Sequence, residues 1–96
     1  MEQPRRKQVQ PQFGSERAFG EALREIRRRR ELSQERLALD AGLDRTYISL
    51  LERGLRNPTL RIIVRLADVL DSSLSEIIGL TESYLKKQPR PNRPKR

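Results

Sequence analysis

The sequence predicts an all-α protein that folds as a compact five-helix bundle, and three observations lead to this prediction. Apolar residues between Phe13 and Leu85 recur at helical spacing, and no segment alternates as a strand would. Hydrophobic residues make up only 34% of the 96 residues, so the core is small, and short helices enclose a small core economically. Capping residues and glycines divide the segment into five short helices.

Each expected helix begins or ends at a residue suited to that position. Serine, threonine and aspartate side chains accept hydrogen bonds from the first turn of a helix, whereas glycine readily adopts the left-handed conformation that ends one. The first helix is expected to start after Ser15, and the second spans 34–41. The other candidate starts and stops are Ser33, Gly42, Asp44, Gly54, Pro58 with Thr59, and Ser73 in a capping box with Glu76.

The apolar positions of these helices define the expected core. In each helix they repeat every three or four residues and therefore share one face. In chain order they are Phe19, Ala22, Leu23, Ile26, Leu37, Ala38, Ala41, Ile48, Leu51, Leu60, Ile63, Ala67 and Leu70, and the fifth helix carries the further apolar residues Leu74, Ile77 and Ile78.

The net charge of +8 lies entirely at the two ends of the chain. Residues 13–85 contain 12 basic and 12 acidic residues, whereas residues 1–12 carry a balance of +2 and residues 86–96 one of +6. Five of the six prolines also lie in the ends. We therefore expect a flexible basic arm over 1–14, a folded domain over 15–80 and a basic tail over 81–96. The ends either keep the protein soluble or neutralise phosphates, and the second interpretation is favoured.

Composition excludes several classes of protein. Cysteine and histidine are absent, which removes disulfides, the usual metal ligands and the usual general base. A chain this short leaves little room for a shielded pocket. We therefore expect no enzyme, no metal or cofactor and no small-molecule ligand. No stretch of about 18 apolar residues could span a membrane, and residues 1–12 lack the apolar centre of a signal peptide. The expected compartment is the cytoplasm.

Residues 34–53 have the pattern of two helices joined by a tight turn. Ala38 is small where the second helix crosses, and Gly42 supplies the positive φ of the turn. Ile48 and Leu51 point inward and hold the second helix to the domain. A helix held by one narrow stripe leaves its other face free to enter a groove of DNA, which is helix-turn-helix geometry.

The stretch LSQERLALDAGLDRTYISLLERGLRNPTLRIIVRLADVL resembles the phage-repressor-like helix-turn-helix family, also called Cro/C1 or XRE. Its S-Q, A-x-x-x-G, Y-I-S and E-R-G elements occur together, and the resemblance covers about residues 18–80. RTYISLLERGLRNPTL is especially similar to controller proteins of restriction–modification systems. The resemblance implies a lambda-repressor-like DNA-binding domain and a sequence-specific transcription regulator, in which Arg27 and Glu52 form an ion pair. Relatives usually lack the long basic ends.

The outward face of the second helix of the motif provides the expected base-reading residues. Because Ile48 and Leu51 point inward, residues on the opposite side of the helical turn point outward, where DNA would lie. Arg45 lies at the start of the helix, and its guanidinium group can donate two hydrogen bonds to the O6 and N7 atoms of guanine. The four candidates are Arg45, Thr46, Ser49 and Leu50.

A second set of residues is expected to contact phosphates. Gln34 lies in the first turn of its helix, where backbone amides hold anions. The resemblance implies the same role for Tyr47, Arg53, Arg56 and Asn57. Tyr47 could equally be a half-buried core ring.

The fifth helix carries more apolar residues than a small core needs, which suggests a homodimer interface. The expected interface residues are Ile77, Ile78, Leu80, Tyr84 and Leu85, as the resemblance also implies; alternatively they cap the core of a monomer. A dimer would place two reading helices about 34 Å apart on a palindromic operator in double-stranded DNA, and the bound protein would associate with the nucleoid.

Two other functions compete with the regulator. One is an antitoxin-like protein-interaction module with secondary DNA binding, although the polar tail does not suit a mainly hydrophobic partner. The other is non-specific nucleic-acid coating, for which the four aromatic residues form a poor stacking platform.

Overall fold

The computed structural model describes residues 14–88 and contains five α-helices, which confirms the predicted fold class. No strand occurs in this part of the chain. Residues 1–13 of the expected arm and residues 89–96 of the expected tail lie outside the described part of the chain. The helices are α1 (Ser15–Arg29), α2 (Gln34–Ala41), α3 (Arg45–Glu52), α4 (Leu60–Val69) and α5 (Leu74–Lys87).

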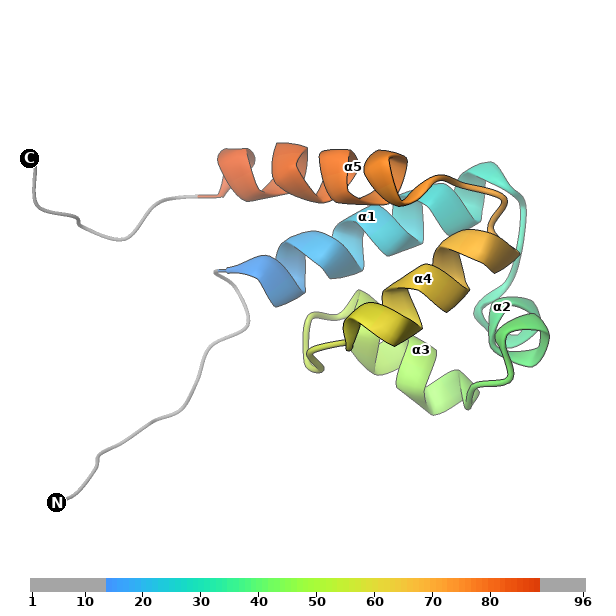
Figure 1. The fold of residues 1–96 in the computed structure, drawn as a ribbon. Helices are drawn as coiled ribbons and strands as arrows, with labels where there is room; N and C mark the ends of the chain where they lie inside the picture. The colour runs from blue at the N-terminus through green and yellow to red at the C-terminus, as the bar shows by residue number, and fades with distance from the viewer. Residues whose placement is uncertain (1–13, 89–96) are drawn as a thin grey trace, which may run out of the picture.

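The long helices α1 and α5 lie side by side and run in opposite directions (Figure 1). Helix α1 also packs against α3, which in turn contacts α2, and α4 contacts both α2 and α5. Helix α1 is therefore covered by α5 on one side and by α3 on another. This arrangement places α2 and α3 together at one end of the molecule (Figure 1).

The helix ends follow the local signals of the sequence. The hydroxyls of Ser33, Thr59 and Ser73 accept hydrogen bonds from the backbone N–H three residues later, at 2.9, 3.1 and 2.9 Å. Gly42 ends α2 with φ of 68°, in the left-handed region. Asp44 precedes α3 as expected, but its side chain makes no capping hydrogen bond.

Helix α5 is longer than the sequence suggested, because residues 81–87 of the expected tail are helical. Two contacts hold this extension to α1. The Tyr84 hydroxyl donates a hydrogen bond to Glu25 at 2.5 Å. The Gly14 N–H donates to the side-chain oxygen of Gln88 at 2.9 Å. The capping box at the other end of α5 is incomplete, since the Glu76 carboxylate accepts from the Ser72 hydroxyl.

Most of the expected core residues are buried, with one correction. Leu60 is 67% exposed, whereas Leu66, which the pattern did not single out, is fully buried. Helix α4 is apolar around more than half of its circumference, and its neighbours α2 and α5 cover only one side of it. Among residues 14–88, no helix has the length and apolar character needed to cross a membrane.

Candidate nucleic-acid interface

Helix α3 is attached to the domain by its inner residues and presents the other face outward. Ile48 and Leu51 are fully buried. Arg45 and Thr46 are exposed at the start of the helix. Ser49 and Leu50 are half-buried. The four expected base-reading residues therefore lie on the side of α3 that is not in the core, and the first two are the most accessible.

The expected phosphate-contacting residues lie around the same helix. Arg53, Arg56 and Asn57 are exposed in the segment that follows α3. Tyr47 is half-buried and packs against the core, so part of its ring has a structural role. Gln34 is in the first turn of α2 and is half-buried, and its side-chain Nε2 donates a hydrogen bond to the Glu52 Oε1 atom at 2.9 Å.

A buried ion pair joins α1 to the end of α3. Arg27 donates from Nε and Nη2 to the two carboxylate oxygens of Glu52, at 2.6 and 3.0 Å, and from Nη1 to the Leu32 carbonyl at 2.7 Å. The Glu52 side chain is completely buried. The structure thus contains the pair that the family resemblance implied.

Glu52 remains ionised in spite of its burial. Burial alone raises the pKa of its carboxyl group, but hydrogen bonds from Arg27 and Gln34 and the charges of Arg27 and Arg24 outweigh burial. The pKa of Glu52 therefore lies below its ordinary value. Because Gln34 bonds to this carboxylate, the ion pair also links α2 to α1 and α3.

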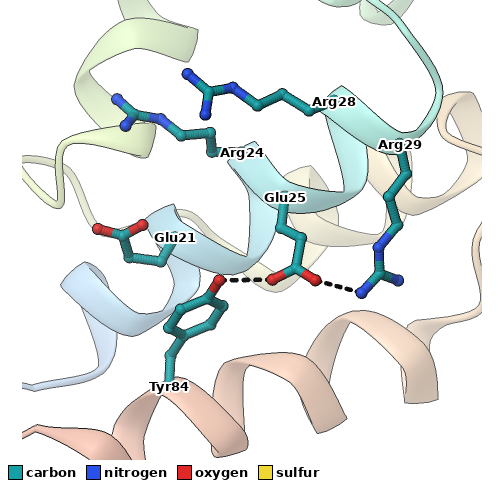
Figure 2. A pocket seen from close by; sticks show the side chains of 6 residues that line it. All are labelled: Glu21, Arg24, Glu25, Arg28, Arg29 and Tyr84. Atoms are coloured by element: carbon teal, nitrogen blue, oxygen red, sulfur yellow. Dashed lines mark hydrogen bonds and ion pairs between the residues drawn. The ribbon is translucent and has the colours of Figure 1, made fainter.

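A second polar cluster occupies the α5 side of α1 (Figure 2). The Tyr84 hydroxyl and the Arg29 guanidinium both donate hydrogen bonds to the Glu25 carboxylate. The bond from Tyr84, followed by the bond and charge of Arg29, lowers the pKa of Glu25 against the opposing effect of its partial burial. The same bond, with a smaller effect of burial, raises the pKa of Tyr84. Tyr84 thus contacts α1 of its own chain.

This placement removes one residue from the expected dimer interface, which otherwise stays a prediction. Ile77 is fully buried in the core of one chain, so it has no surface with which to contact a second copy. Leu80 packs against the same core, and Leu85 is half-buried. Of the five expected interface residues, only Ile78 is exposed.

The sequence reasoning missed an exposed apolar pair on α4. Leu60 is 67% and Val64 is 48% exposed, and they lie one helical turn apart. The width of the apolar stripe on α4 could have predicted this exposed pair. The stripe covers more than half of the helix, and no single neighbouring helix can cover that much. Within the described residues, no group of histidine, cysteine, aspartate or glutamate side chains could hold a metal ion.

Comparison with known proteins places this geometry in a family. The family model described as "Helix-turn-helix" (HTH_3) matches residues 23–77, which include the motif and the ion pair. The chain belongs to this helix-turn-helix family. The resemblance noted from the sequence is thereby confirmed.

Several relatives within the family are restriction–modification controllers. The control protein C.SmaI of Serratia marcescens is 43% identical over 70 residues, which cover 73% of this chain and 81% of that protein. The controller C.AhdI of Aeromonas hydrophila has a solved structure with 48% identity and a TM-score of 0.62, covering 64% of this chain and 92% of that chain. The controller C.Esp1396I, solved as a tetramer with its natural 35-base-pair operator, is 29% identical with a TM-score of 0.70, covering 76% and 96%.

Proposed function

We propose that this protein is a sequence-specific transcription regulator that reads double-stranded operator DNA with α3. One observation carries the proposal: α3 is held only by its buried inner residues, and the start of its outer face exposes Arg45 and Thr46. The relative C.Esp1396I, solved on its operator, supports the same use of the fold here. The proposal places the protein in the bacterial cytoplasm and, when it is bound to DNA, in the nucleoid. It includes no enzymatic role.

Within this proposal the side chains around α3 divide into readers and clamps. Arg45 donates two hydrogen bonds to a guanine, and the smaller side chains of α3 contact neighbouring base edges and methyl groups. The clamps hold phosphates and set the position of α3 without adding sequence preference. They are Gln34, Tyr47, Arg53, Arg56 and Asn57. The basic ends of the chain add further phosphate neutralisation.

The substitution Arg45→Ala tests the assignment of the reading helix. Selection of binding sites from random duplex DNA should yield a palindrome for the wild type. The variant should lose discrimination at one base pair in each half-site, at a cost of about 1–3 kcal/mol, because its guanine contact is gone. The control variant Lys86→Ala removes one charge from an exposed position on α5 and should keep the sequence preference of the wild type. Selection that returns no motif for the wild type would refute sequence-specific regulation.

We further propose that a second copy of the chain covers the exposed face of α4. The apolar pair Leu60 and Val64 is flanked on the same helix by Arg61, Arg65 and Asp68, all exposed. In a two-fold interface one of the two arginines of each copy can meet Asp68 of the other, while the apolar pairs face each other. A dimer of this kind would present two reading helices to a palindromic operator.

Leu60→Asp is expected to weaken the dimer strongly. Burying one leucine is worth about 1.5–3 kcal/mol, and a two-fold interface loses it twice, so the dissociation constant should rise on the order of 100-fold or more. Folding should survive, because aspartate is favourable in the first turn of a helix. Sedimentation over a range of concentrations measures the change.

The matched control is Leu39→Asp, at a leucine on α2 that is 68% exposed. This variant should dimerise as the wild type does. A Leu60→Asp protein that dimerises equally well would move the interface away from α4, and a wild type that is monomeric with and without DNA would remove the dimer altogether.

A further inference from the structure

The five arginines between residues 24 and 30 of the chain differ in how their side chains are bonded. Three of them donate hydrogen bonds: Arg27 to Glu52, Arg29 to Glu25, and Arg30 to the Leu70 carbonyl at 2.7 Å. Arg24 and Arg28 donate none within residues 14–88, and the buried Nε atom of Arg24 has no hydrogen-bond partner. Of the two, Arg24 makes an ion pair of 3.6 Å with Glu52, and Arg28 makes none within residues 14–88.

Arg24 and Arg28 are also placed against each other. They are one helical turn apart on the same face, and like charges at this spacing weaken a helix. They line one open hollow of about 510 Å³ (Figure 2). Its lining residues are Glu21, Arg24, Glu25, Arg28, Arg29 and Tyr84. The two arginines thus carry an unfavourable repulsion that an external anion would relieve.

The nearby carboxylates accept no hydrogen bond from either arginine within residues 14–88. The Arg24 Nε atom lies 3.6 Å from the Glu52 Oε1 atom, but this oxygen already accepts hydrogen bonds from Arg27 and Gln34. Glu25 is bonded to Tyr84 and Arg29 on the other side of the hollow. Glu21 lines the hollow without an ion pair to either arginine.

The position of the two arginines indicates which anion they meet. Arg24 shares the Glu52 oxygen with Gln34, so it lies beside the first turn of α2, where a phosphate contact is proposed. Figure 2 shows both side chains extending from α1 on the side away from Tyr84 and α5. They therefore lie on the side of α1 where α2 and α3 are found.

We propose that Arg24 and Arg28 bind phosphates of the DNA backbone next to the contact made by Gln34, which extends the DNA-binding surface onto α1. This inference rests on the proposed function. Arginine suits the role because its planar guanidinium donates paired hydrogen bonds to phosphate oxygens. The contact strengthens binding to every sequence equally and orients α3 in the groove.

The double variant Arg24→Gln/Arg28→Gln in the full chain tests the proposal. Dissociation constants are measured as a function of salt on the selected operator duplex and on a scrambled duplex of equal length. Loss of two phosphate contacts should make the slope of log affinity against log salt shallower by about 1.8. At 0.1 M salt both affinities should fall on the order of 10- to 100-fold, with their ratio unchanged. In an ethylation-interference assay, ethylation of the phosphates beside the Gln34 contact should no longer weaken binding of the variant.

Three comparisons make the result decisive. Arg29→Gln/Arg30→Gln removes the same charge from two exposed arginines of the same run that bond within the fold, and it should leave the slope nearly unchanged. Arg24→Lys/Arg28→Lys keeps the charge and should restore most of the slope. Should the double glutamine variant fail to fold, the single variant Arg28→Gln, at an exposed position, should lower the slope by about 0.9.

An unchanged slope in the Arg24→Gln/Arg28→Gln variant would overturn the proposal, as would an equal loss of slope in the Arg29→Gln/Arg30→Gln control. Failure of the proposed function would look different. In that case the wild type would show no preference for any sequence, while the salt slope on the scrambled duplex would still report whether the two arginines bind phosphates.

Discussion

Gly20→Ala is expected to destabilise the protein by about 2 kcal/mol or more. A Cβ atom at this position would lie 2.4 Å from the Leu51 carbonyl oxygen and 2.6 Å from that of Glu52, and both are backbone atoms of α3. Overpacking typically costs about 1–3 kcal/mol, and a contact this close with backbone atoms belongs at the upper end of that range. That cost exceeds the roughly 1 kcal/mol that alanine gains over glycine within a helix. The melting temperature should fall by about 8–16 °C.

Gly79→Ala is the matched control, because a Cβ atom there meets nothing within 4 Å. In that variant only the helix preference acts, so stability should rise by up to about 1 kcal/mol. Thermal and urea unfolding of both variants give the comparison. A Gly20→Ala protein as stable as Gly79→Ala would mean that α1 and α3 do not approach as closely as the structure shows.

The requirement for glycine at position 20 could not be predicted from the sequence alone. Ser33, Gly42 and Ser73 were predicted correctly as helix boundaries because each acts on its own backbone within three residues. The need for glycine at position 20 arises from α3, more than thirty residues later in the chain. Nothing in the local pattern of α1 distinguishes this glycine from a weak helix position.

The core of α4 illustrates a second limit. Periodicity shows that Leu60 and Leu66 both belong to an apolar surface, but it does not say which part of that surface a neighbour covers. The structure buries Leu66 and exposes Leu60. The choice depends on where α2 and α5 pack, which is a property of the whole fold.

The run of arginines at the end of α1 shows the same limit at the candidate interface. The reading face of α3 followed from the inward positions of Ile48 and Leu51, and the Arg27–Glu52 pair followed from the family resemblance. The sequence could not separate Arg27 from Arg28, because their roles depend on which helix each faces. Arg27 donates hydrogen bonds to the buried Glu52 carboxylate, whereas Arg28 is exposed and makes no ion pair within residues 14–88.

Glu52→Gln is expected to cost about 3–5 kcal/mol of stability, most of what a small domain has. The change leaves the Arg27 charge buried without its counter-ion, and the desolvation of that charge is no longer repaid. Urea unfolding at neutral pH measures the loss. Glu82→Gln, at an exposed residue of α5, should change stability by less than about 0.5 kcal/mol.

The difference in free energy of unfolding between wild type and Glu52→Gln, here called the gap, should depend on pH in a defined direction. The pKa of Glu52 is lowered in the folded state, so its contribution is fully present above the unfolded-state pKa of about 4.3. The contribution is lost as the pH falls through the lower pKa of the folded state. The gap should therefore stay constant from pH 7 to about 5 and shrink at more acid pH. A gap that does not change with acidification would contradict the assignment.

The pair Arg27→Met/Glu52→Leu separates stability from DNA binding. Replacing both charges with apolar side chains of similar size should recover most of the stability lost in Glu52→Gln, because no buried charge is left unpaired. Gln34 and Arg24, however, lose the oxygen beside which both are held. DNA affinity should therefore remain reduced on the order of 10-fold, equivalent to about one phosphate contact, in a protein that is well folded. Wild-type affinity in this variant would show that the buried pair serves folding alone and does not position the DNA-facing side chains.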